Sequence, residues 1–372
     1  MRRFNILIFN WRDITHPWAG GAERHIHEVS KRLVNAGHTV TLFCARYEGA
    51  KDVEKIDGIE IIRKGGRFSV YVYALWVYMT KLKKRNFDLI IDDINAIPWF
   101  TPLYIRKPKI AIIHHFAKYI FFEELPFLLA IIAYCIEVSY PFIYRKIPFI
   151  TVSPSSRDEM VNVGIPEEHI TIVTHGVDHQ VHKPSEYSKS PYPHLLYLGR
   201  LRNYKNLDML IQAMALVVKE IPSAKLSIVG AGAVQKKLKA LAANLNLSDS
   251  ITFYGYVDDE MKRNFFQNAW VFVTSSEKEG WGLTVIEANA CGTPAVAFAV
   301  PGLKDSIQNG ETGLLVENRS SDAFAERIIE LLKDEELRKR LSAAALKHAQ
   351  QFSWDKAAEE YMNIMEQVAN EL

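Results

Sequence analysis

Residues 271–298 read VFVTSSEKEGWGLTVIEANACGTPAVAF, and this segment places two carboxylates around a glycine-rich turn between two apolar runs. The β-branched run VFVT predicts a strand, the glycines at 280 and 282 interrupt it, TVIEANAC has the composition of a helix, and AVAF predicts the next strand. This order of elements is one repeat of a parallel α/β sheet. The loop carries Glu279 and the helix carries Glu287, and ligands of such sheets bind where the strands end.

Two interpretations of these glutamates stay open. Both could contact a ligand, because the glycines on either side of Trp281 let backbone N–H groups approach it closely. Alternatively, Glu279 is a solvated loop charge, and Glu287 forms a capping box with Thr284, from which it has the spacing S/T-x-x-E.

Length and composition bound the classes of protein to consider. The 372 residues fit two domains of ordinary size, and 48% hydrophobic with 24% charged residues is typical of a globular chain. A formal net charge of +2 argues against a dedicated nucleic-acid binder. The three cysteines are widely spaced and form no CxxC pair, so we expect neither a disulfide framework nor a zinc site, and a reducing cytoplasm is the expected compartment. The start MRRFNILIFNW predicts a buried strand, not a signal peptide.

Strand and helix patterns alternate from the start of the chain. Residues 5–9 and 39–44 predict parallel strands joined by a helix over 22–35. Gly20 and Gly21 precede this helix, where free N–H groups favour an anion or a close substrate; an ordinary flexible loop is the alternative.

Polar residues follow the next predicted strands, which cover 87–92, 109–113 and 148–152. Asp92, Asp93 and Asn95 follow the first of them, and His114 and His115 follow the second. The carboxyl ends of parallel strands meet at one crevice, so we expect these side chains to share it. His115 is the catalytic candidate, and a structural role is the alternative.

A polar, proline-rich stretch over 175–193 predicts a linker between two domains. A second alternating series follows it, with strands over 194–198, 225–229 and 251–254 and helices over 207–220, 234–245 and 258–268. The expected fold is therefore α/β, with two Rossmann-like sheets that face each other across a cleft.

Loops of the second series carry candidate anion-binding groups. Arg200 and Lys205 follow its first strand, and two cations beside a helix start could clamp a diphosphate, although a basic surface turn is equally compatible. Gly230 and Gly232 follow the next strand, but Gln235 stands where a dinucleotide fingerprint has its third glycine, which weakens an NAD or FAD interpretation.

The segments PWAGGAE, HGVD, GRLRNYKN, IVGAG, FYGYV, EKEGWGLTVIEANACGTPAV and NGETGLLV together resemble the retaining nucleotide-sugar glycosyltransferases of GT-B architecture. The resemblance runs from Ile6 to about Tyr361. It implies an N-terminal acceptor domain over 1–175, a donor domain over 176–353, and a final helix within 354–372 that crosses back to the first domain. It also implies transfer of a hexose from a UDP- or GDP-sugar to a glycan or lipid-linked acceptor, as in the synthesis of cell-envelope polysaccharide.

The resemblance also assigns roles to single residues. Arg200 and Lys205 match the residues that hold the donor diphosphate, Glu279 matches the one near the transferred sugar, and Glu287 matches the one that bonds the ribose. His115 resembles the histidine near the reacting carbon. The remaining matches line the donor through their backbone: Gly20, Gly21, Gly230, Gly280, Trp281, Gly282 and Leu283.

The chemistry needs no metal in this interpretation. Negative charge develops on the leaving diphosphate, and fixed cations such as Arg200 and Lys205 stabilise it. We expect no cofactor. A nucleotide-sugar epimerase, a sugar phosphorylase and a non-catalytic nucleotide-sugar binder are the alternatives.

The stretch over 116–146 is apolar and aromatic at its centre, with Lys118, Arg145 and Lys146 at its margins. It is too short to span a bilayer but suits a membrane interface, which would make the protein peripheral at the inner face of the cell membrane and its acceptor lipid-linked. The alternative is a buried helix of the first domain.

Overall fold

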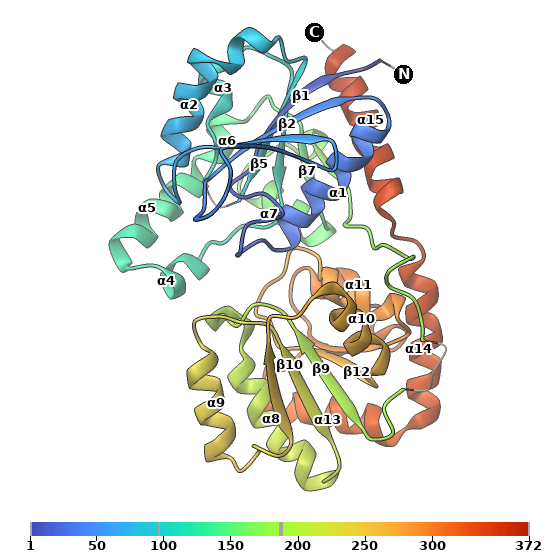
Figure 1. Cartoon of the computed structure of the whole chain (residues 1–372). Coiled ribbons are helices and arrows are strands. Elements are labelled where there is room, and N and C mark those ends of the chain that lie inside the picture. The colour runs from blue at the N-terminus through green and yellow to red at the C-terminus, as the bar shows by residue number, and fades with distance from the viewer. Residues whose placement is uncertain (1, 96, 186–188, 371–372) are drawn as a thin grey trace. The chain divides into compact units, whose positions relative to one another are not determined.

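The computed structural model describes residues 2–95, 97–185 and 189–370 (Figure 1). The chain divides into two compact units. Unit 1 consists of Met1–Gly176 with Trp354–Leu372, and unit 2 consists of Val177–Ser353. Residues 186–188 of the expected linker and residues 371–372 of the segment expected to hold the last helix lie outside the described residues.

Unit 1 is built on an eight-stranded sheet in the order β3-β4-β2-β1-β5-β6-β7-β8. Its strands pair in parallel except β3, which pairs antiparallel with β4. The strands are β1 (Asn5–Phe9), β2 (Thr39–Cys44), β3 (Val53–Ile56), β4 (Ile59–Arg63), β5 (Leu89–Ile94), β6 (Lys109–Ile113), β7 (Phe149–Thr151) and β8 (Ile170–Ile172).

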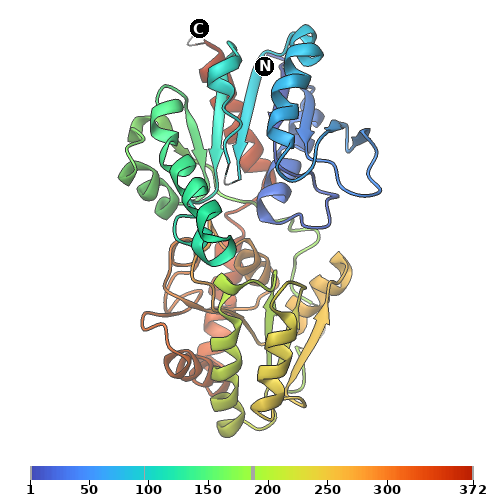
Figure 2. The same cartoon turned by 90° about the vertical axis from the view of Figure 1, so that its left-hand side faces the viewer.

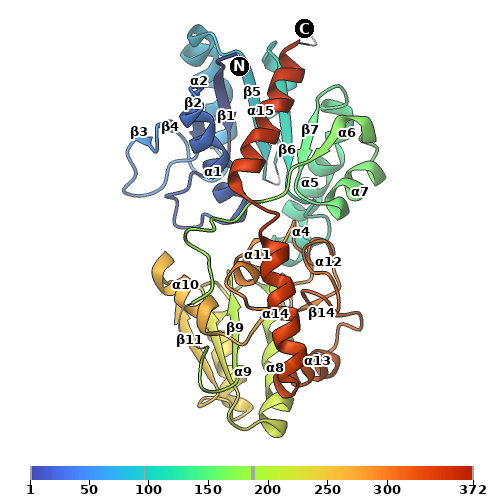
Figure 3. The same ribbon diagram turned by 90° about the vertical axis from the view of Figure 1, so that its right-hand side faces the viewer.

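Helices cover both faces of this sheet. Helix α1 (Gly21–Asn35) packs against α15 (Trp354–Asn370), which Figure 3 shows crossing one face, so α15 completes the core of unit 1. The other helical segments are α2 (Val70–Thr80), η1 (Leu82–Arg85), α3 (Thr101–Tyr104), α4 (Ile120–Glu124), α5 (Phe127–Val138), α6 (Tyr140–Ile143), α7 (Pro154–Asn162) and η2 (Glu167–His169).

Unit 2 is a six-stranded parallel sheet in the order β11-β10-β9-β12-β13-β14. Its strands are β9 (His194–Leu198), β10 (Lys225–Val229), β11 (Ile251–Gly255), β12 (Val271–Thr274), β13 (Ala295–Phe298) and β14 (Gly313–Val316). Its helices are η3 (Asn203–Lys205), α8 (Leu207–Glu220), α9 (Gln235–Asn244), α10 (Asp259–Asn268), α11 (Leu283–Ala290), α12 (Leu303–Ser306), α13 (Ser321–Lys333) and α14 (Glu335–Ala349). The predicted fold class, two Rossmann-like units with parallel sheets, is confirmed.

The placement of Asp92 and Asp93 after a strand is wrong. Strand β5 extends to Ile94, and both carboxylates are fully buried inside it. They are tolerated because each has buried partners: Asp92 accepts from Thr101 at 2.7 Å and from Tyr144 at 2.5 Å, and Asp93 lies 3.1 Å from Nε2 of His114. Burial raises the pKa of the Asp92 carboxyl to about 6, although these hydrogen bonds favour its charged form.

The interpretation of the apolar stretch as a buried helix is also wrong. Helix α5 buries only Ala130, Ala133 and Glu137, while Phe127 is 69% and Leu128 73% exposed. Glu137 fixes the preceding loop, because its carboxylate accepts from the backbone N–H groups of residues 117 and 118 at 2.6 and 2.8 Å. The apolar side chains of α5 therefore form a surface, not a core.

Candidate functional site

The turn between β12 and α11 packs against the loop that follows β9. The Ser275 hydroxyl donates to the backbone oxygen of Lys205 at 2.9 Å, and the N–H of Glu277 donates to the backbone oxygen of Tyr204 at 2.8 Å. Gly282 ends the turn with a φ of +98°, a left-handed conformation that suits glycine. The sequence folds this way because two short parallel strands leave their loops at the same edge of the sheet.

Glycines let the loops of unit 2 approach one another. A Cβ atom on Gly230 would lie 2.0 Å from the backbone oxygen of Gly199, and one on Gly302 would lie 2.3 Å from that of Glu279. Gly232 packs in the same way against the backbone of Leu201. The loops after β9 and β10 are therefore fixed backbone to backbone, which accounts for Gly230 and Gly232 without a dinucleotide fingerprint.

Lys205 and Glu279 meet within this loop cluster. The Lys205 ammonium, which lies beside the Tyr204 ring, donates a hydrogen bond to Oε1 of Glu279. The Ser276 hydroxyl donates to the same oxygen at 2.8 Å. Burial alone would lower the pKa of the Lys205 ammonium, but the Glu279 carboxylate outweighs it and raises that pKa. Glu279 is thus a paired carboxylate, not a solvated loop charge.

Arg200 lies on the same loop with a different environment. Its side chain is exposed, and a guanidinium nitrogen lies 3.5 Å from the Tyr204 hydroxyl. Its positive charge acts on Lys205, whose pKa it tends to lower. The structure thus brings the two predicted cations and Glu279 together at the carboxyl end of β9 and β12.

Glu287 forms no capping box. Helix α11 begins at Leu283 with Gly282 as its N-cap, so Thr284 is already inside the helix. The Glu287 carboxylate instead pairs with the Lys262 ammonium of α10 at 2.7 Å. Sequence reasoning missed Lys262, since nothing local to α10 signals a partner 25 positions further along the chain.

The indole of Trp281 is buried and packs edge-on against Phe352, with ring centroids 5.2 Å apart. The bulky side chain therefore anchors the turn by packing against Phe352 inside unit 2. The backbone of Gly280, Trp281, Gly282 and Leu283 follows the turn into the first residue of α11, where N–H groups and the helix dipole favour an anion.

In unit 1, Gly20 is the N-cap of α1 and Gly21 its first residue, one position before the predicted start. The Gly20 N–H donates to the Glu23 carboxylate at 2.7 Å, and Glu23 is held in turn by Arg12 at 2.8 Å. Hydrogen bonds within unit 1 thus hold the backbone at Gly20 in place.

The two adjacent histidines have separate environments. His114 is buried and lies 3.1 Å from Asp93, whereas His115 is exposed. Burial and the Asp93 carboxylate explain the position of the His114 ring. His115 is the histidine of this pair whose side chain is exposed.

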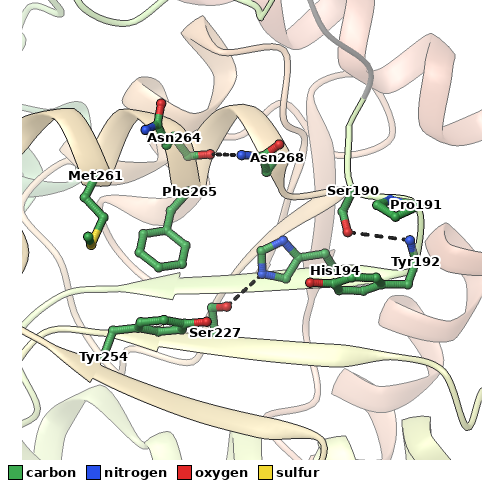
Figure 4. A pocket seen from close by; sticks show the side chains of 10 residues that line it. All are labelled: Ser190, Pro191, Tyr192, His194, Ser227, Tyr254, Met261, Asn264, Phe265 and Asn268. Carbon is green, nitrogen blue, oxygen red and sulfur yellow. Dashed lines mark hydrogen bonds between the residues drawn. The ribbon is translucent and has the colours of Figure 1, made fainter.

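A groove in unit 2 lies apart from these residues, between α10 and the sheet (Figure 4). His194 contacts the Ser227 hydroxyl at 2.8 Å within it. The groove is lined by Ser190, Pro191, Tyr192, His194, Ser227, Tyr254, Met261, Asn264, Phe265 and Asn268, which include no predicted site residue.

No three His, Cys, Asp or Glu side chains among residues 2–95, 97–185 and 189–370 are grouped so as to hold a metal ion. In the same part of the chain, no helix combines the length and the apolar character needed to cross a bilayer.

Comparison with known proteins assigns the family. The model for glycosyltransferase family 4 matches residues 19–181, and the model for glycosyl transferases group 1 matches residues 178–348. A D-inositol 3-phosphate glycosyltransferase from Streptomyces griseus is 37% identical over 172 residues, which are 44% of this chain and 36% of that relative. The match thus spans about a third of the relative's length.

Solved structures extend the likeness to the whole chain. Sucrose-phosphate synthase from Thermosynechococcus elongatus covers 100% of both chains with a TM-score of 0.85 and 23% identity. The Anabaena protein HepE, solved in complex with UDP-glucose, covers 98% of this chain and 100% of its own with a TM-score of 0.77 and 17% identity. The chain belongs to the glycosyltransferases of GT-B fold, with the group 1 family in its second unit.

Proposed function

We propose that this protein is a retaining hexosyltransferase that takes its sugar from a UDP- or GDP-sugar and passes it, without a metal, to a glycan or lipid-linked acceptor. The observation that carries this proposal is the pairing of Lys205 with Glu279 beside Arg200 at one loop edge. Such an edge combines cations for a diphosphate with a carboxylate for sugar hydroxyls. The complex of HepE with UDP-glucose supports the choice of donor.

The proposed chemistry follows from the charges. When the bond between the sugar and the diphosphate breaks, the leaving oxygen gains negative charge, which Arg200 and Lys205 stabilise in place of a metal. The acceptor hydroxyl forms the new bond on the same face of the sugar and gives its proton to the leaving diphosphate oxygen. Glu279 accepts hydrogen bonds from the sugar and orients it. We propose His115, which is exposed on unit 1, as the catalytic histidine.

A donor and product assay tests this function. UDP- and GDP-hexoses are first screened by thermal shift, and the donor that binds is then incubated with candidate acceptors while free nucleoside diphosphate and the anomeric configuration of the product are measured by NMR. We expect diphosphate release that depends on the acceptor and a retained anomer. An epimerised donor without diphosphate release identifies an epimerase. Sugar phosphate that forms from a glycan only when inorganic phosphate is added identifies a phosphorylase, and donor binding without turnover identifies a non-catalytic binder.

The acceptor side of the proposal concerns two apolar surfaces of unit 1. The first is formed by α5 and α6, where Phe127, Leu128, Ile132 and Phe142 are exposed. The second is formed by α2, whose exposed residues are Val72, Tyr73, Leu75, Trp76 and Met79.

Both surfaces belong to the same side of the unit 1 sheet. The core under α2 includes Ile90 of β5, and the core under α6 includes Ala111 of β6. Because Ile90 pairs with Lys109 in the parallel register, Ala111 points to the same face as Ile90. Figure 2 views the molecule from this side.

A lipid surface suits this side better than a protein partner. The α2 surface ends in exposed Lys81, Lys83, Lys84 and Arg85, which would meet anionic headgroups as the apolar side chains enter the interface. Each apolar helix is bordered by aromatic residues, a composition that membrane interfaces favour. We infer a protein that is peripheral at the inner face of the cell membrane and takes a lipid-linked acceptor there.

Flotation with liposomes of anionic phospholipid tests the membrane contact. Phe121 is buried, so Phe127→Glu with Leu128→Glu is the variant that changes the surface and spares the core. Wild type is expected to float and this variant to stay at the bottom, as is Trp76→Glu with Met79→Glu on α2. Tyr256→Glu changes an exposed aromatic residue of unit 2 and is the matched control, which should float as wild type does. Wild type that stays at the bottom at low salt removes the membrane from the proposal.

A further inference from the structure

Unit 2 holds a second buried pair of carboxylate and ammonium. The Lys262 Nζ atom lies 2.9 Å from Oε1 and 2.7 Å from Oε2 of Glu287, so both carboxylate oxygens share one ammonium. The Glu287 side chain is 1% exposed and that of Lys262 14% exposed. On the other side, Nε2 of His182 lies 3.5 Å from Oε1 of Glu287.

The helical spacing of α10 places Lys262 on the face of the helix that meets the Glu287 carboxylate. Residues 261, 264, 265 and 268 line the groove of Figure 4, whereas Lys262 and Phe266, four positions apart, lie on a neighbouring face. The Lys262 ammonium lies 5.8 Å from the centre of the Phe266 ring, and the His182 ring packs edge-on against the same ring at 5.9 Å. These contacts hold the lysine in place.

Burial of the Glu287 carboxylate explains why it is paired with Lys262. A carboxylate as buried as Glu287 takes up a proton or moves toward solvent when it has no counter-ion, since an isolated buried charge is strongly unfavourable. Lys262 keeps Glu287 charged and fixes the direction of its oxygens. A carboxylate offers about four lone-pair sites, so it can accept hydrogen bonds from a ligand while it stays paired with Lys262.

We infer that Lys262 is a positioning residue for recognition of the donor ribose. It holds Glu287 ionised and oriented so that the carboxylate accepts hydrogen bonds from the two ribose hydroxyls. This role rests on the proposed function, because it requires a nucleotide donor whose ribose is bound by Glu287. Lys262 acts through Glu287 and not on the reacting atoms.

The test compares ribose and deoxyribose nucleotides. Binding of UDP, GDP and their 2′-deoxy counterparts is measured by calorimetry on the full chain. Wild type should prefer the ribonucleotide by about tenfold or more, the scale of one hydrogen bond to a charged group. In Lys262→Met the ratio of the two affinities should fall toward one, and in Lys262→Arg part of the preference should remain. Lys237→Met changes an exposed lysine of α9 and is the control, so its preference should equal that of wild type.

A second variant shows whether an effect of Lys262→Met comes only from misfolding. Lys262→Met with Glu287→Gln leaves no unpaired buried charge, so it should fold and should also lack the ribose preference. A lower melting temperature together with an unchanged ribose preference in either variant overturns the role of Lys262 while the proposed function stands. Wild type that binds neither UDP nor GDP overturns the proposed function and this role with it.

Discussion

The Lys205 ammonium is hydrogen-bonded to the Glu279 carboxylate, so the cation that we propose for the diphosphate is held by the carboxylate that we propose for the sugar. Each group fixes the other before any ligand arrives. Such preorganisation means that the site reorganises little when charge develops on a leaving group.

Removing either cation should weaken nucleotide binding. Arg200→Ala and Lys205→Ala should each raise the Kd for UDP or GDP by roughly tenfold to a hundredfold, the loss of one hydrogen bond to a charged group. Lys205→Ala should have the larger effect, because it also leaves Glu279 as a bare negative charge beside the diphosphate. Calorimetry measures both, with Lys237→Ala as the control. Equal affinities in wild type and both variants would remove the clamp.

Substitution of Glu279 should affect turnover, whereas substitution of Glu287 should affect nucleotide binding. Glu279→Gln should lower kcat by about a hundredfold, the scale of a lost transition-state contact, without weakening UDP or GDP binding. Glu287→Ala should weaken binding of the nucleotide itself. Steady-state kinetics with calorimetry separates the two effects, and a Glu279→Gln variant with wild-type turnover contradicts the orienting role.

The buried carboxyl of Asp92 should give unit 1 a distinct pH dependence. The pKa of Asp92 is about 6 in the folded protein against an ordinary value of 3.8 for an aspartate, so between these values the folded state keeps a proton that the unfolded chain has released. The contribution of Asp92 to stability is therefore present below pH 3.8 and lost as the pH rises toward 6. The slope is about 1.4 kcal/mol per pH unit at most.

Asp92→Asn removes this titration. In urea unfolding followed by tryptophan fluorescence, the stability of wild type relative to Asp92→Asn should fall as the pH rises from 3.8 to 6. Asp249→Asn, at an exposed position of unit 2, should show no such trend. Parallel pH profiles for wild type and Asp92→Asn would contradict the assignment.

Gly230 should tolerate no side chain. Its φ is +130°, and a Cβ atom would lie 2.0 Å from the backbone oxygen of Gly199, so Gly230→Ala must push the Arg200 and Lys205 loop out of place. We expect a lower melting temperature and weaker UDP or GDP binding. Gly310→Ala is the control, because Gly310 has a φ of +78° with no atom within 4 Å of the added carbon and so tests backbone strain alone, which costs about 1–2 kcal/mol. Equal losses in the two variants would show that the contact with Gly199 is unimportant.

The sequence predicts the strands of unit 2 well because they are short apolar runs between clear breakers. His194–Leu198, Lys225–Val229 and Ala295–Phe298 lie where the pattern predicts them. The predicted end of strand β5 is wrong because two aspartates inside a strand contradict the apolar pattern. Only long-range partners such as Tyr144 make these buried aspartates acceptable.

Helix α2 escaped prediction for a related reason. Its sequence VYVYALWVYMT is apolar on all sides, so it lacks the periodicity that identifies a surface helix. The same absence of pattern left core and surface indistinguishable for α5. In the candidate site, the positions of Arg200, Lys205 and Glu279 on loops followed from strand order, but the partners of Glu287 did not, since helix-to-helix contacts leave no local signal.

The place of helix α15 in the chain affects the order in which the two units can complete their cores during synthesis. Synthesis proceeds from the N-terminus, and domains generally fold as units as they emerge. The strands of unit 1 emerge first, yet α1 meets its partner α15 only after residues 177–353 have been translated. Unit 2 can therefore complete its core from one continuous segment, whereas the buried side of α1 stays uncovered until α15 has also been made.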